Sequence, residues 1–185
     1  MHEYPVNSLQ SAPEESRPAL RTLESAFGFI PNIVGAMSTS PVLINSLVGL
    51  FGNVHRGSFS EAQVQVLLLT NAVTNGAIWA VAFHSSLALK EGIAPADVEA
   101  IRDGRAPKDV ALAALSILAK TLIEKRGRLD DQDKETFLAA GFGPDHLLEV
   151  IAVIAASTIT NYTASVTRTP LEAAFQVHAW NSAKA

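Results

Sequence analysis

Apolar residues along this chain recur at the three- and four-residue spacing of helices, and no segment shows the strict alternation of a half-buried strand. The most apolar of the expected helices begins behind Ser60, which serves as its N-cap, and runs to about Val73. Its side chains are apolar on almost every face, including Val64, Val66, Leu67, Leu68, Leu69 and Ala72. A helix of this kind is normally buried. We therefore expect this segment at the centre of the domain.

Proline, glycine and capping residues divide the rest of the chain into further helices. The acidic residues after Pro13 open a helix that runs toward Gly28, and Ser40 with Pro41 opens another that ends near Gly57. Asn75-Gly76 interrupts the chain before a helix that Gly92 stops, and further helices are expected at about 108–125, 130–140 and 144–167. There is no internal repeat or linker. The pattern predicts an all-α, single-domain helical bundle over residues 1–185.

Composition narrows the classes of partner. The chain has 185 residues, 48% of them apolar, which is enough for one well-buried domain. Only 17% are charged, against about 25% in typical soluble chains, so we expect a homo-oligomer that covers some helix faces. The net charge of −4 and the lack of a Lys/Arg cluster argue against nucleic acid and anionic membranes as partners.

The sequence also bears on location. We find no apolar run of about 18–20 residues and no signal peptide at the start, and we expect a cytoplasmic protein. The chain contains no cysteine, so it forms no disulfide, and redox arguments give no information on its compartment.

One segment carries a family resemblance. Residues 74–86 read TNGAIWAVAFHSS, which resembles the signature of the alkylhydroperoxidase D branch of the carboxymuconolactone decarboxylase superfamily. In that signature a Cys-x-x-Cys opens a helix and a histidine follows four residues after the second cysteine. Here Ala77 and Ala80 occupy the two cysteine positions, and His84 occupies the histidine position. The resemblance also implies a proton-relay Glu twelve residues before the first cysteine, where this chain has Gln65.

Weaker matches in the same order extend the resemblance over most of the chain. They are similar to the peroxidase-related members of the family, and they lie at 27–32 with 40–43, 58–61, 92–98 with 101–104, 157–162 and 169–175. The resemblance implies the alkylhydroperoxidase D-like fold, with an N-terminal helical extension at 1–57 and the core and tail at 58–185. It also implies a trimer or a doubled trimer (hexamer), built by the motif-bearing and C-terminal helices.

The departures from the signature bear on activity. Alanine cannot supply the thiolate that attacks a peroxide, and the amide of Gln65 cannot carry a proton away. We therefore expect no thiol peroxidase activity. Engineered replacement of natural cysteines would also produce Ala77 and Ala80, although Gln65 would then require a further change. The decarboxylases of the superfamily resemble a pattern with Glu four residues before the histidine, a position that Ala80 occupies here.

His84 and Gln65 are the candidate catalytic residues, and Trp79 and His55 are candidate pocket residues. A lone histidine on an apolar helix is usually a packed core residue, so the functional interpretation of His84 depends on the resemblance. That resemblance implies His84 within hydrogen-bond reach of Gln65, and a small apolar cavity bounded by Ala77, Ala80 and Trp79. His55 lies near a helix end, where a cation favours the helix dipole, and it matters only if folding brings it to His84.

The remaining titratable groups suggest no cofactor. His2, His146 and His178 lack the spacing of metal ligands, and the acidic residues Asp130, Asp131 and Asp133 are typical of a solvated helix start. There is no nucleotide-binding fingerprint, so we expect no metal and no cofactor.

Two classes of function remain open. One is an enzyme that uses His84 as an acid or base on a small apolar or lactone-like substrate. The other is a non-catalytic relative that keeps the fold for ligand binding or for assembly.

Overall fold

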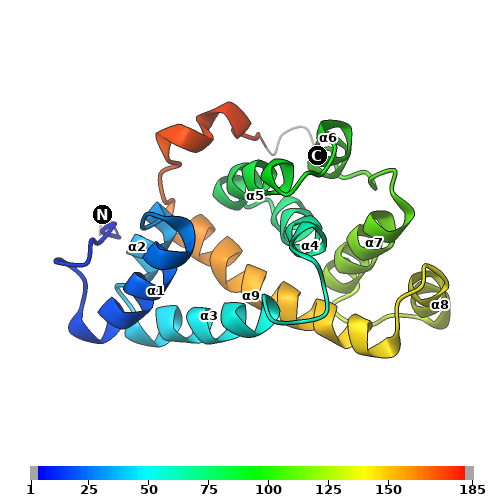
Figure 1. Ribbon diagram of the computed structural model, residues 1–185, viewed down its shortest axis with the longest axis horizontal. Helices are drawn as coiled ribbons and strands as arrows, with labels where there is room; N and C mark the ends of the chain where they lie inside the picture. Colours follow the sequence, from blue (N-terminus) through cyan, green and yellow to red (C-terminus); the bar gives the residue numbers. More distant parts are fainter. Residues whose placement is uncertain (1–3, 182–185) are drawn as a thin grey trace.

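The computed structural model describes residues 4–181, and within that range all of the regular secondary structure is helical (Figure 1). The elements are η1 (Glu14–Ser16), α1 (Arg17–Phe27), α2 (Asn32–Met37), α3 (Pro41–Val54), α4 (Glu61–Thr74), α5 (Ile78–Lys90), α6 (Pro95–Arg102), α7 (Val110–Glu124), α8 (Asp131–Ala139), α9 (Pro144–Thr167) and η2 (Ala173–His178), where η denotes a 3-10 helix. The predicted all-α class is confirmed.

The helix starts follow the local capping chemistry. The Ser60 hydroxyl accepts a hydrogen bond from the backbone N–H of Gln63, whose side chain accepts from the N–H of Ser60, and this reciprocal pair fixes the start of α4. Ser40 caps α3 in a similar way by accepting from the N–H of Leu43, with Pro41 in the first turn. Asp130 and Asp133 form the same reciprocal arrangement at α8, which confirms the helix start expected from their sequence.

Helix α4 lies at the centre of the bundle. Every residue from Val64 to Val73 is buried. The helix packs against α5, α6, α7 and α9, and α9 runs diagonally across the molecule below it in the view of Figure 1. Burial on every face explains why the sequence of α4 is apolar all round. The expected central position is confirmed.

Two elements depart from the sequence-based expectation. The sequence pattern predicted no helix between Gly28 and Ser40, yet Asn32 begins the six-residue helix α2, and the carboxylate of Glu172 accepts a hydrogen bond from its backbone N–H at 2.6 Å. The tail forms η2, which contacts α5. Both elements depend on contacts with segments that are distant in the sequence, so local periodicity does not reveal them. Helix α3 also ends at Val54, three residues before Gly57.

Helix α9 qualifies the expectation that no segment reaches membrane-spanning length. Among the described residues it is the one helix long and apolar enough to cross a membrane by length and composition. Its most apolar window is 44% buried within the protein, and it packs against α2, α3, α4, α5 and α7. A core helix of a bundle meets the same two criteria.

Candidate functional site

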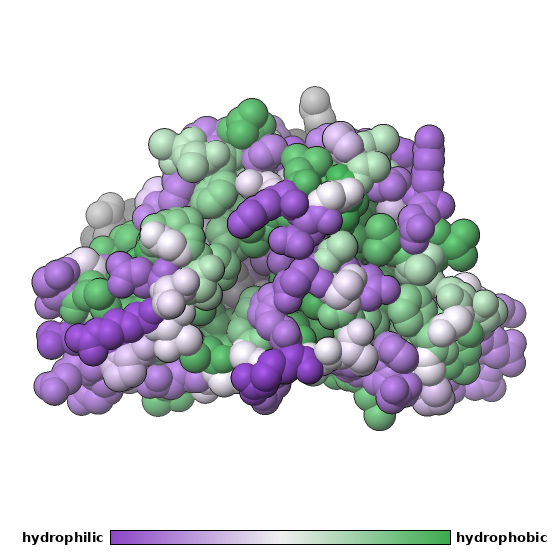
Figure 2. Space-filling view, in the orientation of Figure 1, coloured by the Kyte–Doolittle hydropathy of each residue, from purple (hydrophilic) through white to green (hydrophobic). Residues whose placement is uncertain are grey.

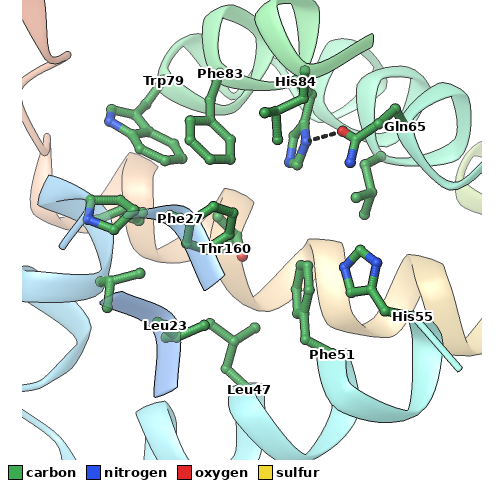
Figure 3. A pocket seen from close by; sticks show the side chains of 15 residues that line it. Leu23, Phe27, Leu47, Phe51, His55, Gln65, Trp79, Phe83, His84 and Thr160 are labelled. Atoms are coloured by element: carbon green, nitrogen blue, oxygen red, sulfur yellow. Dashed lines mark hydrogen bonds between the residues drawn. The ribbon is translucent and has the colours of Figure 1, made fainter. Parts of the chain in front are cut away.

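A pocket opens between α1 and α3 on one side and α4 and α5 on the other, with Thr160 of α9 at its base (Figure 3). Trp79, Phe83, His84 and Gln65 point into it from α5 and α4, facing Phe51 and the other residues of the opposite wall. The cavity has a volume of about 60 Å³. Figure 2 shows the surface hollowed over the same gap between the helices.

His84 and Gln65 form a hydrogen-bonded pair in this pocket. The Nδ1 atom of His84 lies 3.0 Å from Oε1 of Gln65, and the two side chains are only 3% and 5% exposed. An amide oxygen only accepts hydrogen bonds, so Nδ1–H is the donor and the neutral ring carries its lone pair on Nε2. Within the described residues nothing hydrogen-bonds to Nε2, which faces the pocket (Figure 3). The expected proximity of the two residues is confirmed.

The surroundings keep His84 neutral. Burial, and to a smaller degree the neighbouring His55, lower the pKa of His84 to about 3 from its ordinary value of 6.5. At neutral pH the ring is therefore uncharged. Its Nε2 atom is a hydrogen-bond acceptor in a largely apolar enclosure, and the ring has no proton to give as an acid at that nitrogen.

His55 lines the same pocket. It follows the last residue of α3, and its Nδ1 lies 3.0 Å from both carboxylate oxygens of Glu61, at the start of α4. Its ring also packs against Phe51 at a centroid distance of 5.5 Å. Folding thus brings His55 into the pocket of His84, which is the condition stated above for a role of His55. The hydrogen bond to Glu61 orients the imidazole.

Aromatic rings form the wall beside His84. Trp79 stacks on Phe83 at 4.8 Å and 20°, and the rings of Phe27 and Phe175 meet Phe83 edge-on at 5.5 and 5.1 Å. These stacked and edge-on geometries are the favourable ones for aromatic pairs. Trp79 was a candidate pocket residue from the sequence, and in the structure it lines the pocket wall.

Glu172 holds this wall in place. Its Oε2 accepts a hydrogen bond from Nε1 of Trp79 at 2.9 Å, while its Oε1 accepts from the backbone N–H of Asn32. The side-chain amide of Asn32 in turn donates to the carbonyl of Pro170. One carboxylate therefore ties the tail to both α2 and α5. Sequence reasoning included Glu172 only within the family resemblance at 169–175 and not as a site residue, because its partners lie 93 and 140 residues away.

The alanines at the cysteine positions lie outside the pocket. Ala77 and Ala80 are 1% and 0% exposed, belong to the apolar core and do not line the cavity. The expectation of a cavity bounded by both alanines and Trp79 is therefore wrong in its position, and only Trp79 lines the pocket. Core side chains pack against the two methyl groups, as close packing of protein interiors requires.

A wider cleft adjoins the inner cavity. It has a volume of about 590 Å³ and shares Phe27, Phe51, His55, Gln65 and Phe83 with the cavity. Glu61, Lys90 and Glu91 are also among its lining residues. Together the two spaces form an apolar chamber with a charged rim, which is the usual form of a small-molecule site.

The other histidines have separate places in the structure. Nδ1 of His146 accepts a hydrogen bond from the N–H of Gly143 at the start of α9, and its ring packs against Phe59 and Phe142. His178 closes η2, and His2 lies outside the described residues. No group of three or more His, Cys, Asp or Glu side chains within residues 4–181 is arranged to hold a metal ion.

Comparison with known proteins relates the chain to one fold. No family model matches it, and no curated protein does. A solved structure of a peroxidase-related protein from Ralstonia eutropha JMP134, described as an alkylhydroperoxidase AhpD core, superposes with a TM-score of 0.82 at 16% identity, covering 94% of this chain and 93% of that one. A peroxidase-related protein from Silicibacter sp. TM1040 superposes with a TM-score of 0.76 at 16% sequence identity, covering 94% of this chain and 92% of that one. The chain thus has the alkylhydroperoxidase D-like fold.

A third similar structure carries a ligand. The debrominase Bmp8 superposes with a TM-score of 0.75 at 18% identity, covering 89% of this chain and 90% of that one. A variant of it, with one cysteine replaced by alanine, has been solved in complex with 2,3,4-tribromopyrrole, and it superposes with the same TM-score at 19% identity, covering 89% of both chains. These identities establish similarity of fold.

Proposed function

We propose that this protein binds a small, flat, apolar molecule carrying one N–H or O–H group, without the thiol chemistry of the cysteine-containing fold. The observation that carries the proposal is the free Nε2 of a neutral His84 inside an aromatic pocket. A thiol peroxidase function is not proposed, since the chain contains no cysteine.

The position of Nε2 selects for a hydrogen-bond donor. A polar atom in an apolar enclosure that lacks a partner costs roughly 1–3 kcal/mol relative to one that is hydrogen-bonded. A ligand that fills the pocket covers Nε2, so a ligand N–H or O–H pointed at this atom avoids that cost, and a ligand with only acceptors incurs it. Because Nδ1–H is already engaged by Gln65, the ring is held in the tautomer that accepts at Nε2.

The dimensions of the chamber restrict the ligand further. An engineered apolar cavity of about 150 Å³ is large enough for benzene. The inner cavity, at about 60 Å³, is smaller, so an aromatic ring must extend into the adjoining cleft or displace a wall side chain. Phe51 is one of the side chains that line both spaces, and its movement would join them. The stacked pair Trp79–Phe83 supplies a flat face for the ring.

The debrominase complex supports the same class of ligand. In that structure a variant with a cysteine replaced by alanine holds 2,3,4-tribromopyrrole, a flat, apolar ring with a single N–H. Loss of a thiol in this fold is thus compatible with retention of a small aromatic molecule. We propose that halogenated or methylated pyrroles and phenols are the class to which this chain's pocket is suited.

A second candidate function is proton-transfer catalysis, which the pair His55–Glu61 favours. A histidine hydrogen-bonded to a carboxylate at the mouth of a pocket has the arrangement of a general base. His84 is a weaker candidate for that role, because a pKa of about 3 makes it a poor base and leaves it unprotonated at neutral pH. In this catalytic alternative, His84 orients the substrate by a hydrogen bond and His55 accepts a proton from the substrate.

Ligands of matched shape test the binding proposal. Calorimetric titration with 2,3,4-tribromopyrrole and with its N-methyl derivative compares a donor with a blocked donor on the same ring. We expect the N–H compound to bind at least about 10-fold more tightly, as one hydrogen bond to a buried acceptor provides. Equal affinities, or binding of neither compound, would contradict the proposal.

Product analysis separates binding from catalysis. The bound ligand is recovered after incubation and identified by mass spectrometry, with His55→Gln and Glu61→Gln variants treated in parallel. Recovery of unchanged ligand from every sample supports a binding protein. A product that forms with the unsubstituted protein and is lost in both variants supports the catalytic candidate.

A further inference from the structure

A second cleft lies where α4 meets α6 and α7, which Figure 1 shows on the side of α4 away from α1. It has a volume of about 370 Å³ and shares no lining residue with the aromatic pocket or its adjoining cleft. Small-molecule sites are usually about 300–1,000 Å³ in volume, so this space can hold a ligand. We refer to it as the α6–α7 cleft. Its polar and charged lining includes Thr70, Arg105, Ser116, Lys120, Thr121 and Glu124.

Two buried hydroxyl groups in the α6–α7 cleft have one more proton than they use. Thr70 on α4 and Ser116 on α7 are 4% and 5% exposed, and their hydroxyl oxygens lie 2.9 Å apart. Whichever hydroxyl donates to the other, the second proton has no acceptor among the described residues. A molecule that fills the cleft covers this O–H, so it must accept a hydrogen bond from it or leave it unpaired at a cost.

Two cations from different elements stand at the same cleft. Nζ of Lys120, on α7, donates to the carbonyl oxygen of Gly104 at 3.2 Å, which places the ammonium beside the loop that carries Arg105. An ammonium has three N–H donors and a guanidinium has five. Within the described residues each of these two side chains uses one donor in a hydrogen bond, Lys120 to Gly104 and Arg105 to Asp103. Most of their donors are therefore free for a ligand.

The acidic side chains nearby neutralise these cations only in part. Asp103 pairs with Arg105 at 2.8 Å, but the two side chains are 55% and 66% exposed, and exposed ion pairs contribute little. Asp103 does not line the cleft. Glu124 does, and its carboxylate lies 4.0 Å from Nζ of Lys120, at the outer limit of an ion pair. The lining thus has an excess of positive charge in a chain whose net charge is −4.

We propose that the α6–α7 cleft binds a small molecule through a carboxylate or phosphate group. Guanidinium and ammonium groups are the usual partners of such oxyanions, and arginine can donate two parallel hydrogen bonds to them. The ionised oxygens only accept hydrogen bonds, which matches the surplus O–H of the Thr70–Ser116 pair. An apolar ligand would cover these donors without pairing them. The proposal is independent of the function proposed for the aromatic pocket, because the two sites share no residue.

Calorimetric titration of the intact protein tests the chemical class of the ligand. The probes are inorganic phosphate, succinate and succinamide, all at one ionic strength set with sodium chloride, because salt screens exposed charges. We expect saturable binding of phosphate, of succinate or of both. Succinamide, which has the same carbon skeleton without charge, should bind at least about 10-fold more weakly than the better anion. Tighter binding of phosphate supports a phosphate compound, and tighter binding of succinate supports a carboxylate. Binding of neither anion, or equal binding of succinamide, would overturn the proposal.

Charge variants test whether the anion occupies this cleft. Arg105→Gln and Lys120→Gln should each weaken binding of the better anion at least about 10-fold. Arg21→Gln, at an exposed position on α1, makes the same change of charge away from the cleft and should stay within about 2-fold, since distant exposed charges are screened. Circular dichroism verifies that each variant is folded. Equal losses in all three variants would mean that the protein attracts an adventitious ion only, and would overturn the site.

The hydroxyl pair gives a test that leaves the charge unchanged. Thr70→Val and Ser116→Ala each leave one hydroxyl, whose proton is then free to donate, so either variant alone should bind within about 3-fold of the unsubstituted protein. The double variant removes the donor and should lose about 10-fold in affinity, more than the two single losses combined. Unchanged affinity in the folded double variant would show that the anion binds outside the cleft, and would overturn the proposal.

Discussion

The imidazole of His84 donates from Nδ1 to the amide oxygen of Gln65 across 3.0 Å, between two helices at the centre of the bundle. An amide at position 65 fixes the ring and its tautomer but cannot take up the proton. The pair therefore presents a fixed acceptor, Nε2, to the pocket. This geometry suits recognition of a ligand by a hydrogen bond. A proton relay would instead need a residue at position 65 that can take up and release a proton.

The first prediction concerns stability and pH. The pKa of His84 is about 3 in the folded protein against an ordinary value of 6.5, so the unfolded chain binds the extra proton between those values. Stability is therefore lost as pH falls below about 6.5. From pH 7 to pH 5 this one group should lower the free energy of unfolding by about 2 kcal/mol. Urea denaturation across that range measures the loss.

A His84→Leu variant is the control for this prediction, because it lacks the titrating ring and keeps a side chain of apolar character. Its free energy of unfolding should fall less between pH 7 and pH 5, with the difference near 2 kcal/mol. Equal losses in the two proteins would show that His84 takes up its proton as readily in the folded state as in the unfolded one.

The second prediction concerns the carboxylate that joins Trp79 to Asn32. Replacing Glu172 by Leu removes two hydrogen bonds to a charged acceptor that is partly exposed, and we expect a loss of roughly 1–3 kcal/mol. Because Trp79 loses its partner, its fluorescence should change as well. The measurement uses a Trp180→Phe background, which leaves Trp79 as the sole tryptophan.

Glu172→Gln is the matched variant for that experiment. Its amide oxygen can still accept from one of the two donors, so its stability should lie between those of the unsubstituted protein and Glu172→Leu. Unchanged unfolding and fluorescence in Glu172→Leu would mean that packing alone holds the tail and the aromatic wall.

The third prediction is the absence of peroxidase activity. Without a thiolate the protein should consume neither hydrogen peroxide nor organic hydroperoxides above a heat-killed control, with a dithiol as reductant. Consumption that scales with the concentration of folded protein would contradict this expectation.

The fourth prediction restores the missing groups. Ala77→Cys with Ala80→Cys should give weak activity at best, because Gln65 cannot carry a proton and both positions are buried beside the pocket. Addition of Gln65→Glu should raise the rate measurably. Equal rates in the double and triple variants would show that position 65 takes no part in proton transfer in this scaffold.

Local chemistry made much of the fold predictable. The cap at Ser60 involves residues three apart, and the all-round apolar pattern of α4 reflects its own burial, so the sequence carried both signals. The pairing of His84 with Gln65, nineteen residues apart, came from the family resemblance, because periodicity does not specify which faces of two helices meet.

The rest depended on distant contacts. Glu172 contributes to the site only because the tail returns to α2 and α5, and no local pattern marks that return. The cavity expected beside Ala77 and Ala80 was misplaced because a small side chain does not reveal whether its neighbours pack against it. The role of His55 could not be predicted from the sequence either, because it depends on which helices pack together. Its place in the pocket follows from the packing of α3 beside α4 and α5.

A double-mutant cycle between protein and ligand tests the central claim most directly. The affinities of 2,3,4-tribromopyrrole and its N-methyl derivative are measured for the unsubstituted protein and for His84→Leu, with circular dichroism to verify that the variant is folded. If Nε2 of His84 accepts from the ligand, the substitution weakens the N–H compound by about 10-fold or more and leaves the N-methyl compound within about 3-fold. If both compounds bind equally well before and after the substitution, His84 is a packed core residue and the proposed recognition is wrong.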